Sequence, residues 1–391
     1  MRLDELDYSL PAELIAQVPV EPRDAARLLV VRGAGAGLSC DDRSFRELPD
    51  LLRPGDVLVR NDTRVIPARA RFCRPTGGRV ELLFLERLAD AASGPASSAG
   101  EIWEALARGR LRGGEILRSE AAPAELAVEV EAPLGEGRYR VRSAGVRAEP
   151  LVSLLERYGE TPLPPYIKTA LADPERYQSV FARPRGSAAA PTAGLHFTAA
   201  LDRALVAAGV TIEHLTLHVG LATFRPVTVE RLEDHPLHDE PFVVDRGALR
   251  RLASARAEGR RVVAVGTTMV RLLEELGAAG LLAAPAGAAS PAGATGTGAS
   301  RVEAGGRSVA AQPEAPLHGR TRLFITPGHR FVAVDGLITN FHLPRTSLLA
   351  LVMAFCGVDE TRRVYGHAIA GRYRFYSFGD AMLAFHGGVA P

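Results

Sequence analysis

The sequence predicts an α/β protein: a discontinuous α/β domain with a mostly parallel sheet, plus a small inserted β-barrel domain. Residues from about 70 to 145 contain short strand-like segments separated by Gly, Pro and Ser, with no segment of helical period, which is typical of a barrel. After residue 150, strand-like and helical segments alternate, as in βαβ units. We therefore expect an α/β domain from residues 1–69 and 150–391 and a barrel domain from residues 70–149.

Short strands joined by turns are predicted before the barrel. The run LLVV at residues 28–31 indicates a buried strand, GAGAG at 33–37 a turn, and residues 38–40 a second edge. Residues 54–69 indicate a turn and two strands separated by the polar break NDTR. The break falls where the first of these strands ends.

Helices and strands alternate after the barrel. Residues 151–159 have helical apolar spacing, and the prolines within 161–167 fix an extended path. The segments that follow are helix 197–209, strand 211–219, helix 248–259, strand 261–266, helix 267–277, a strand within 334–344, helices ending near 357 and 371, and a last segment at 373–383. Residues from about 281 to 319 are rich in Ala, Gly and Pro and too poor in apolar bulk to offset their ordering entropy, which predicts a disordered surface loop.

Composition indicates a globular protein of the cytoplasm. The 391 residues are 47% hydrophobic and 24% charged, with a net charge of +2 at pH 7. Lys168 is the single lysine, so nearly all the basic residues are arginines, which suit phosphate but are also favoured by a GC-rich genome. The three cysteines share no CxxC spacing, the acidic start lacks a secretory apolar region, and the longest apolar run, at 348–358, is too short to span a membrane.

Polar side chains stand at the predicted carboxyl ends of several strands, where ligands collect in α/β sheets. Thr267 and Thr268 follow the strand at 262–265, and either could cap the next helix or contact a ligand. The other polar strand ends carry Asn61, Asp62 and Arg64 in NDTR, His218 and Arg225 in LHVGLATFR, and Asn340 and His342 in ITNFHLP.

Histidines raise two further alternatives. In PTAGLHF (191–197), His196 is either a ring that faces the core at a helix start or a reactive group beside a ligand cradle. His235 and His238 have a spacing that suits zinc, but Pro236 breaks the helix that would align them, so we expect no metal. Motifs of hydrolase triads, dinucleotide folds and P-loops are missing from the sequence.

As an ordered set, these segments resemble the S-adenosylmethionine:tRNA ribosyltransferase-isomerase family of queuosine biosynthesis. The matching segments cover most of the chain and read RNDTRVIPARA, PTGGRVELL, PLPPYI, ERYQSVF, AAPTAGLHF, LTLHVGLATFRPV, DHPLHDE, VVAVGTTMVRLLE, VDGLITNFHLPRTSLLALV and YRFYSFGDAML. The resemblance implies an α/β domain with a β-barrel and a transferase that uses no metal and no redox cofactor. S-adenosylmethionine would be consumed as a ribosyl donor.

The resemblance also implies the acceptor and the partners. The acceptor would be the aminomethyl group of a 7-deazaguanine at the wobble position of tRNA, and the products would be epoxyqueuosine-tRNA, adenine and methionine. The enzyme would bind the anticodon stem-loop that carries this base. We expect a cytoplasmic monomer without membrane contact.

Residue roles within this resemblance are hypotheses. His196 and His218 would transfer protons, because imidazole titrates near neutral pH. The run with Thr192 and Gly194 would let backbone amides approach the donor, with Gly194 adopting unusual torsions. The remaining substrate contacts would come from Asn61, Asp62, Arg64, Arg225, His235, His238, Thr267, Thr268, Asn340, His342 and Tyr376.

Some positions depart from the family's pattern. Asp62, Ala222 and Met269 stand where the family usually has NNTR, GxGTF and GTTSVR, which leaves the acceptor open. The alternatives are a paralogue that uses the same donor on another acceptor, a non-catalytic tRNA-binding protein of the same fold, and a zinc hydrolase built on His235 and His238.

Overall fold

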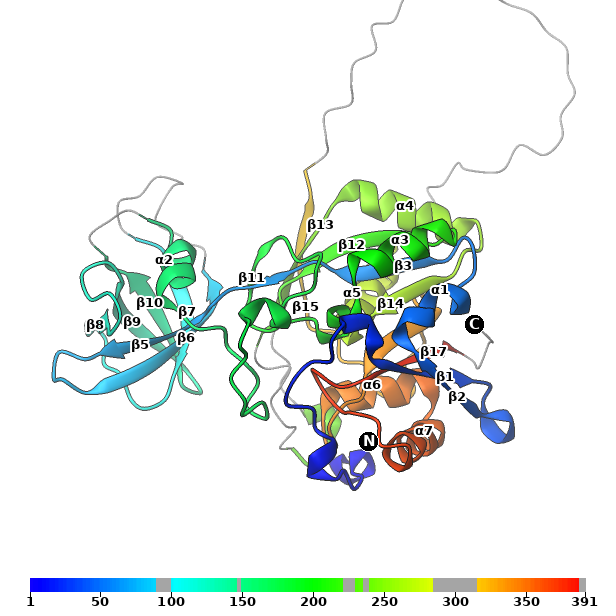
Figure 1. The fold of residues 1–391 in the computed structure, drawn as a ribbon. Coiled ribbons are helices and arrows are strands. Elements are labelled where there is room, and N and C mark those ends of the chain that lie inside the picture. Colours follow the sequence, from blue (N-terminus) through cyan, green and yellow to red (C-terminus); the bar gives the residue numbers. More distant parts are fainter. Residues whose placement is uncertain (89–99, 146–148, 221–228, 235–238, 284–314, 387–391) are drawn as a thin grey trace, which may run out of the picture.

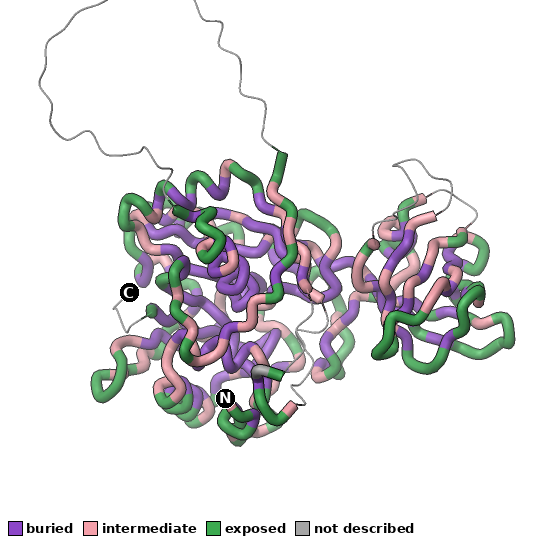
Figure 2. The backbone as a smooth tube through the Cα atoms, turned by 180° about the vertical axis from the view of Figure 1, so that it is seen from behind, coloured by how far each residue is buried: buried purple, intermediate pink, exposed green. Residues whose placement is uncertain are grey.

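The protein has two parts, a large sheet with helices on both faces and a small barrel beside it (Figure 1). Each part has its own buried apolar cluster, and Figure 2 shows buried segments inside both parts with exposed segments around them. The computed structural model describes residues 1–88, 100–145, 149–220, 229–234, 239–283 and 315–386.

Nine strands form the large sheet: β1 (Arg27–Arg32), β2 (Ser39–Ser44), β3 (Val57–Asn61), β12 (Thr211–Leu217), β13 (Glu240–Val244), β14 (Val262–Val265), β15 (Leu317–Thr321), β16 (Gly336–Asn340) and β17 (Ala381–Phe385). Their order is β15-β13-β12-β3-β14-β16-β17-β1-β2. The central strands β12, β3, β14 and β16 are parallel to their neighbours in this group. The α/β class with a barrel is therefore confirmed.

The sheet is mixed, whereas the sequence predicted a mostly parallel one. Four of the eight pairings between described strands are parallel and four are antiparallel. The connection from β16 to β17 explains one reversal, because it contains two helices, α6 (Ser347–Cys356) and α7 (Val358–Ala370). A single helix would return the chain to the edge where β16 begins, and the next strand would then be parallel to β16. Two successive helices return it to the edge where β16 ends, so β17 runs antiparallel to β16.

Helices cover the two faces of the sheet because side chains alternate along each strand. On one face, Val57 and Val59 join a cluster that contains residues of α4, α5, α6 and α7. On the other face, Leu58 joins a cluster that contains residues of α1 and α3. The other helices of the large part are α1 (Leu48–Leu51), α3 (Ala199–Ala207), α4 (Arg246–Ala257) and α5 (Thr267–Ala278).

The barrel is closed, with strand order β10-β7-β6-β5-β8-β9. Its strands are β5 (Arg69–Cys73), β6 (Arg79–Arg87), β7 (Ile102–Ala107), β8 (Ile116–Ser119), β9 (Ala127–Gly135) and β10 (Arg138–Ser143). Helix α2 (Leu151–Tyr158) packs Leu151, Leu154 and Leu155 into the barrel cluster. The domain boundary near residue 150 stays a prediction, and α2 lies with the barrel.

Two crossings connect the parts. The short strands β4 (Arg64–Val65) and β11 (Arg185–Ser187) pair in parallel there. The amide of Arg64 donates to the carbonyl of Pro184 at 2.7 Å. Residues 185–187 therefore lie beside the segment that leads into the barrel and run in the same direction as it.

One predicted loop is shorter than expected. Of residues 281–319, the stretch 284–314 lies outside the described residues, but Leu317–Thr321 forms β15 and pairs with β13. Among the described residues, no helix is long and apolar enough to cross a membrane.

Candidate active site

Polar strand ends from separate segments meet around one small cavity of about 30 Å³. The residues that line it include Thr192, Val219, Gly266, Thr267, Thr268, Thr339, Asn340, His342, Tyr376 and Ser377. They meet because β14 and β16 are parallel neighbours whose carboxyl ends share one edge of the sheet. The antiparallel β17 begins at this same edge, which brings Tyr376 and Ser377 to it.

The N-terminus of α5 opens onto this cavity. Gly266, the residue before the helix, has φ +87°, a conformation that disfavours residues with a Cβ. The first amides of a helix have no acceptor within their own helix, so they attract anions. Thr268 is 7% exposed, and its hydroxyl has no hydrogen-bond partner among the described residues. A buried hydroxyl of this kind is costly unless a ligand satisfies it.

Asn340 connects three segments at the end of β16. Its side-chain amide donates to the carbonyl of Tyr376 at 3.1 Å and lies 3.1 Å from Nε2 of His196. Its side-chain oxygen accepts from the hydroxyl of Thr192 at 3.2 Å. The side chain of Asn340 thus fixes the edge of the cavity.

His196 belongs to the core beneath the cavity. It lies in a 3-10 helix (Thr192–His196), is 4% exposed, and contacts the ring of Phe45 with centroids 4.9 Å apart. It lines a separate cavity of about 10 Å³. Burial, together with the charges of Arg374 and Arg23, lowers the pKa of His196 to about 3. The imidazole is therefore neutral at pH 7 and does not titrate near neutrality, contrary to the expectation from the sequence.

His342 is also buried and neutral. Its Nε2 lies 2.9 Å from the hydroxyl of Thr339, and its amide donates to the hydroxyl of Tyr365 at 3.1 Å. The Tyr8 hydroxyl donates to its carbonyl. Burial lowers the pKa of His342 to about 3. These contacts hold the loop after β16 in one conformation.

Tyr376 has an unusual backbone. Its φ is +74°, which is uncommon for a residue with a bulky side chain and occurs where surrounding contacts enforce it. Its ring lies 4.0 Å from that of Tyr166, centroid to centroid, and Tyr166 hydrogen-bonds to Ser377. Burial raises the pKa of Tyr376 above its usual value.

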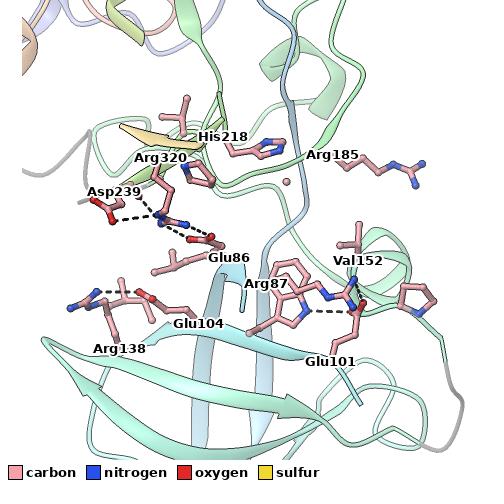
Figure 3. Close-up of a pocket in the computed structure, with 18 of the residues that line it drawn as sticks. Glu86, Arg87, Glu101, Glu104, Arg138, Val152, Arg185, His218, Asp239 and Arg320 are labelled. Atoms are coloured by element: carbon pink, nitrogen blue, oxygen red, sulfur yellow. Dashed lines mark hydrogen bonds and ion pairs between the residues drawn. The ribbon is translucent and has the colours of Figure 1, made fainter. Parts of the chain in front are cut away.

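His218 faces a second and larger cavity of about 660 Å³ between the barrel and the large sheet (Figure 3). Its Nδ1 lies 2.8 Å from the hydroxyl of Thr63. A Cβ at Gly186 would lie 2.9 Å from the His218 ring, so glycine is needed for this close approach. Burial lowers the pKa of His218, against the opposing effect of Glu86. Val219 lines both cavities, so they adjoin.

The NDTR segment has mainly structural contacts. The side chain of Asn61 donates to the carbonyl of Leu217 at 2.9 Å, and Asp62 accepts from Thr216 at 2.6 Å. Burial raises the pKa of Asp62. Arg64 pairs with Glu175 at 2.5 Å. The contacts of Asn61 and Asp62 fasten the end of β3 to β12, whereas the pair of Arg64 joins β4 to the 3-10 helix Pro174–Tyr177. The structure does not bring these side chains into the small cavity.

Gly194 has a different role from the one expected. The backbone positions with positive φ do not include it, but a Cβ there would lie 3.1 Å from the ring of Phe181. Gly194 is thus small because of packing. The predicted contacts of Arg225, His235 and His238 lie outside the described residues. No group of three or more potential metal ligands occurs in the part of the chain that the structure describes.

Several residues that line the two cavities, or contact their lining, were missed from the sequence. Ser377 and Tyr166 lie in segments that the sequence singled out, YRFYSFGDAML and PLPPYI, but only the fold places them together. Glu86 and Arg320 line the larger cavity from the barrel and from β15. No local pattern marks them, because their meeting depends on how the barrel sits beside the sheet.

Comparisons with known proteins match the chain from end to end. The family model described as "Queuosine biosynthesis protein" matches residues 3–384. S-adenosylmethionine:tRNA ribosyltransferase-isomerases are 48% identical in Rubrobacter xylanophilus, with 99% of both chains covered, and 46% identical in Moorella thermoacetica, with 98% of this chain and 99% of that protein covered. The crystal structure of S-adenosylmethionine tRNA ribosyltransferase from Thermotoga maritima is 32% identical, covering 97% of this chain and 100% of that one, with a TM-score of 0.48.

Proposed function

Because this chain belongs to the queuosine biosynthesis protein family, we propose that it transfers and isomerises the ribosyl group of S-adenosylmethionine onto tRNA. The acceptor is the aminomethyl group of 7-aminomethyl-7-deazaguanine at the wobble position, and the products are epoxyqueuosine-tRNA, adenine and methionine. The observation that carries this proposal is the sequence similarity to S-adenosylmethionine:tRNA ribosyltransferase-isomerases over nearly the whole chain. The two adjoining cavities supply the chemistry that the reaction needs.

The amino-acid end of the donor binds at the N-terminus of α5. The free amides there favour a carboxylate, and the Thr268 hydroxyl donates to it, which satisfies a group that is otherwise unpartnered among the described residues. Asn340 and Thr192 hold the opposite edge of the cavity through their mutual hydrogen bond.

The rest of the donor needs the adjoining space. A cavity of about 30 Å³ is too small for the nucleoside part of the donor. The larger cavity, which adjoins it at Val219, has the volume usual for ligand sites. We place the sugar, the adenine and the acceptor base there, against His218.

The sulfonium of the donor makes the first step possible, because its charge acidifies the protons of C5′. A base removes one of them, the bond from C4′ to the ring oxygen breaks, and adenine leaves C1′ as an aldehyde forms there. This leaves a vinyl sulfonium across C4′ and C5′, and the acceptor amine adds to C4′ with loss of its proton. The resulting C5′ carbanion forms a bond to the aldehyde carbon C1′, and the alkoxide on C1′ then displaces methionine from C5′ to close the epoxide. No step requires a metal or a redox cofactor, since S-adenosylmethionine is consumed as a substrate.

His218 is the candidate for proton transfer. When the Thr63 hydroxyl accepts from Nδ1–H, Nε2 is left as an acceptor beside the larger cavity. The depressed pKa of His218 keeps the ring neutral and able to take a proton at pH 7. His196, deep beneath the cavity, acts instead as a positioning residue for Asn340.

The partner is the anticodon stem-loop with its modified base, and we propose a cytoplasmic monomer. Incubation of the purified protein with S-adenosylmethionine and this stem-loop should release adenine and methionine in equal amounts. A stem-loop with unmodified guanine at the wobble position is the control and should release none. Equal adenine release with the modified and the unmodified stem-loop would point to another acceptor. Binding of the stem-loop without adenine release would point to a non-catalytic protein.

A further inference from the structure

The larger cavity is lined by an unusual density of charge. Its lining includes five arginines and four carboxylates, contributed by the barrel, by β15 and by the loops beside them. Arg87 pairs with Glu101 at 3.1 Å and Arg138 with Glu104 at 3.4 Å, both within the barrel (Figure 3). Within each of these two pairs, the arginine and the carboxylate line the cavity and neutralise each other's charge.

Two of the arginines form what we call the arginine pair, Arg320 and Arg322. Arg320 lies in the edge strand β15 and Arg322 directly follows its end, so their Cα atoms are roughly 6.6 Å apart along an extended chain. That spacing suits neighbouring phosphates of one nucleic-acid strand. Both side chains reach Asp239, so they lie on the same side of the chain. The exposed fractions of their side chains are 43% and 75%.

Two carboxylates cover the arginine pair. Arg320 donates to both oxygens of Glu86 on the barrel strand β6, at 2.6 Å and 3.0 Å. Arg322 donates to Asp239 at 2.7 Å, and Arg320 lies 3.4 Å from the same carboxylate. We call Glu86 and Asp239 the masking carboxylates. Figure 3 shows Arg320 between them.

These ion pairs are exchangeable. Exposed pairs of this kind contribute little to stability, because water screens them. A phosphodiester offers a guanidinium the same bidentate geometry as a carboxylate, and arginine binds it readily. The arginine pair therefore has a ready alternative partner once a nucleic acid reaches the cavity.

The position of the pair relates it to the proposed reaction. Arg320 and His218 line the same cavity, and the charge of Glu86 acts on both side chains. A base that reaches His218 from the solvent would bring its own backbone past β15. The barrel carboxylate would then have to leave the path of the phosphates.

We propose that the arginine pair is a phosphodiester-binding site for the tRNA anticodon loop, which the masking carboxylates occupy until RNA displaces them. The proposal rests on the proposed function, since it assumes a tRNA substrate. It adds that Glu86 restrains RNA binding by occupying Arg320 in the free protein.

Binding of an anticodon stem-loop to the full chain tests this proposal, measured at several salt concentrations. Glu86→Gln should tighten binding by about two- to five-fold, the equivalent of one exposed ion pair. Arg320→Ala should weaken binding and reduce the slope of log K against log salt by about 0.7–0.9 for each phosphate that the variant leaves unneutralised. Glu120→Gln is the matched control, because Glu120 pairs with Arg79 at 3.3 Å on the barrel, outside the cavity lining.

Unchanged affinity in Glu86→Gln together with an unchanged slope in Arg320→Ala would overturn the proposal. Equal effects in Glu86→Gln and Glu120→Gln would also overturn it, because they would reflect overall charge alone. Adenine release by the wild type is independent of these outcomes. The proposed reaction can therefore be correct even if the phosphodiester site is wrong. If the wild type releases no adenine while the salt dependence of RNA binding changes in Arg320→Ala as expected, the proposed reaction is wrong and the phosphodiester site is supported.

Discussion

Replacing Thr268 by Val should make the protein more stable and its substrate binding weaker. Valine keeps the shape of threonine but removes the hydroxyl, which is buried and has no partner among the described residues. In the free protein, the hydroxyl carries a desolvation penalty of about 1–3 kcal/mol. Thr268→Val should remove part of it and raise the free energy of unfolding by about 1 kcal/mol.

Substrate binding should change in the opposite direction. If the hydroxyl donates to the carboxylate of the donor, its loss removes a hydrogen bond to a charged group, worth about 1.5–3 kcal/mol. The KM for S-adenosylmethionine should then rise about tenfold or more, since 1.4 kcal/mol corresponds to about a factor of ten. Thr268→Ser should restore most of the affinity.

The assay combines urea unfolding with steady-state adenine release. Trp103, the single tryptophan, lies in the barrel, so its fluorescence reports the unfolding of the barrel, which Thr268→Val should leave unchanged. Far-UV circular dichroism follows the unfolding of the α/β part. The matched control is Thr361→Val in α7, where the hydroxyl donates to the carbonyl of Gly357 at 2.7 Å. That change should lower stability and leave KM unaltered. If Thr268→Val lowers stability as Thr361→Val does, or leaves KM unchanged, the proposed carboxylate site is wrong.

Two further predictions concern the histidines. His218→Gln, which keeps a polar group beside Thr63, should lower the kcat of adenine release by about 10²–10⁴-fold with a small effect on KM, as expected for loss of a proton-transfer group; a kcat within a factor of about three of the wild type would exclude His218 from that role. His196 and His342 have pKa values of about 3 in the folded protein, below the value of about 6.5 in the unfolded chain, so the unfolded state binds more protons below pH 6.5. The free energy of unfolding should therefore be undiminished by these histidines above about pH 6.5. It should fall as the pH drops toward 3, by about 2 kcal/mol for each histidine at pH 5. Ring NMR signals that titrate near pH 6 would contradict this account.

The sequence predicted much of the framework because its patterns are local. The alternation of apolar runs and helices after residue 150 is reproduced by α3, β12, α4, β14 and α5. The antiparallel β17 was missed, since its direction depends on counting the two helices α6 and α7 as a reversing pair. The edge strand β15 was missed because it adjoins a segment of low complexity.

For the candidate site, strand ends were informative and individual side chains less so. Asn340 and Thr268 meet at one cavity because parallel strands end together, which the sequence already indicated. The protonation state of His196 could not be predicted from the sequence. Its pKa depends on burial against Phe45 and on the charges of two arginines that are far from it in the sequence, Arg23 and Arg374. The bonds of Asn61 to β12 likewise depend on a pairing between segments far apart in the chain.

A structure of the protein with bound S-adenosylhomocysteine would test the central claim most directly. We expect the carboxylate of the ligand to accept hydrogen bonds from the first amides of α5 and from the Thr268 hydroxyl, with the adenosine extending past Val219 toward His218. A ligand bound with its carboxylate elsewhere, and with the Thr268 hydroxyl still unpartnered, would contradict the account.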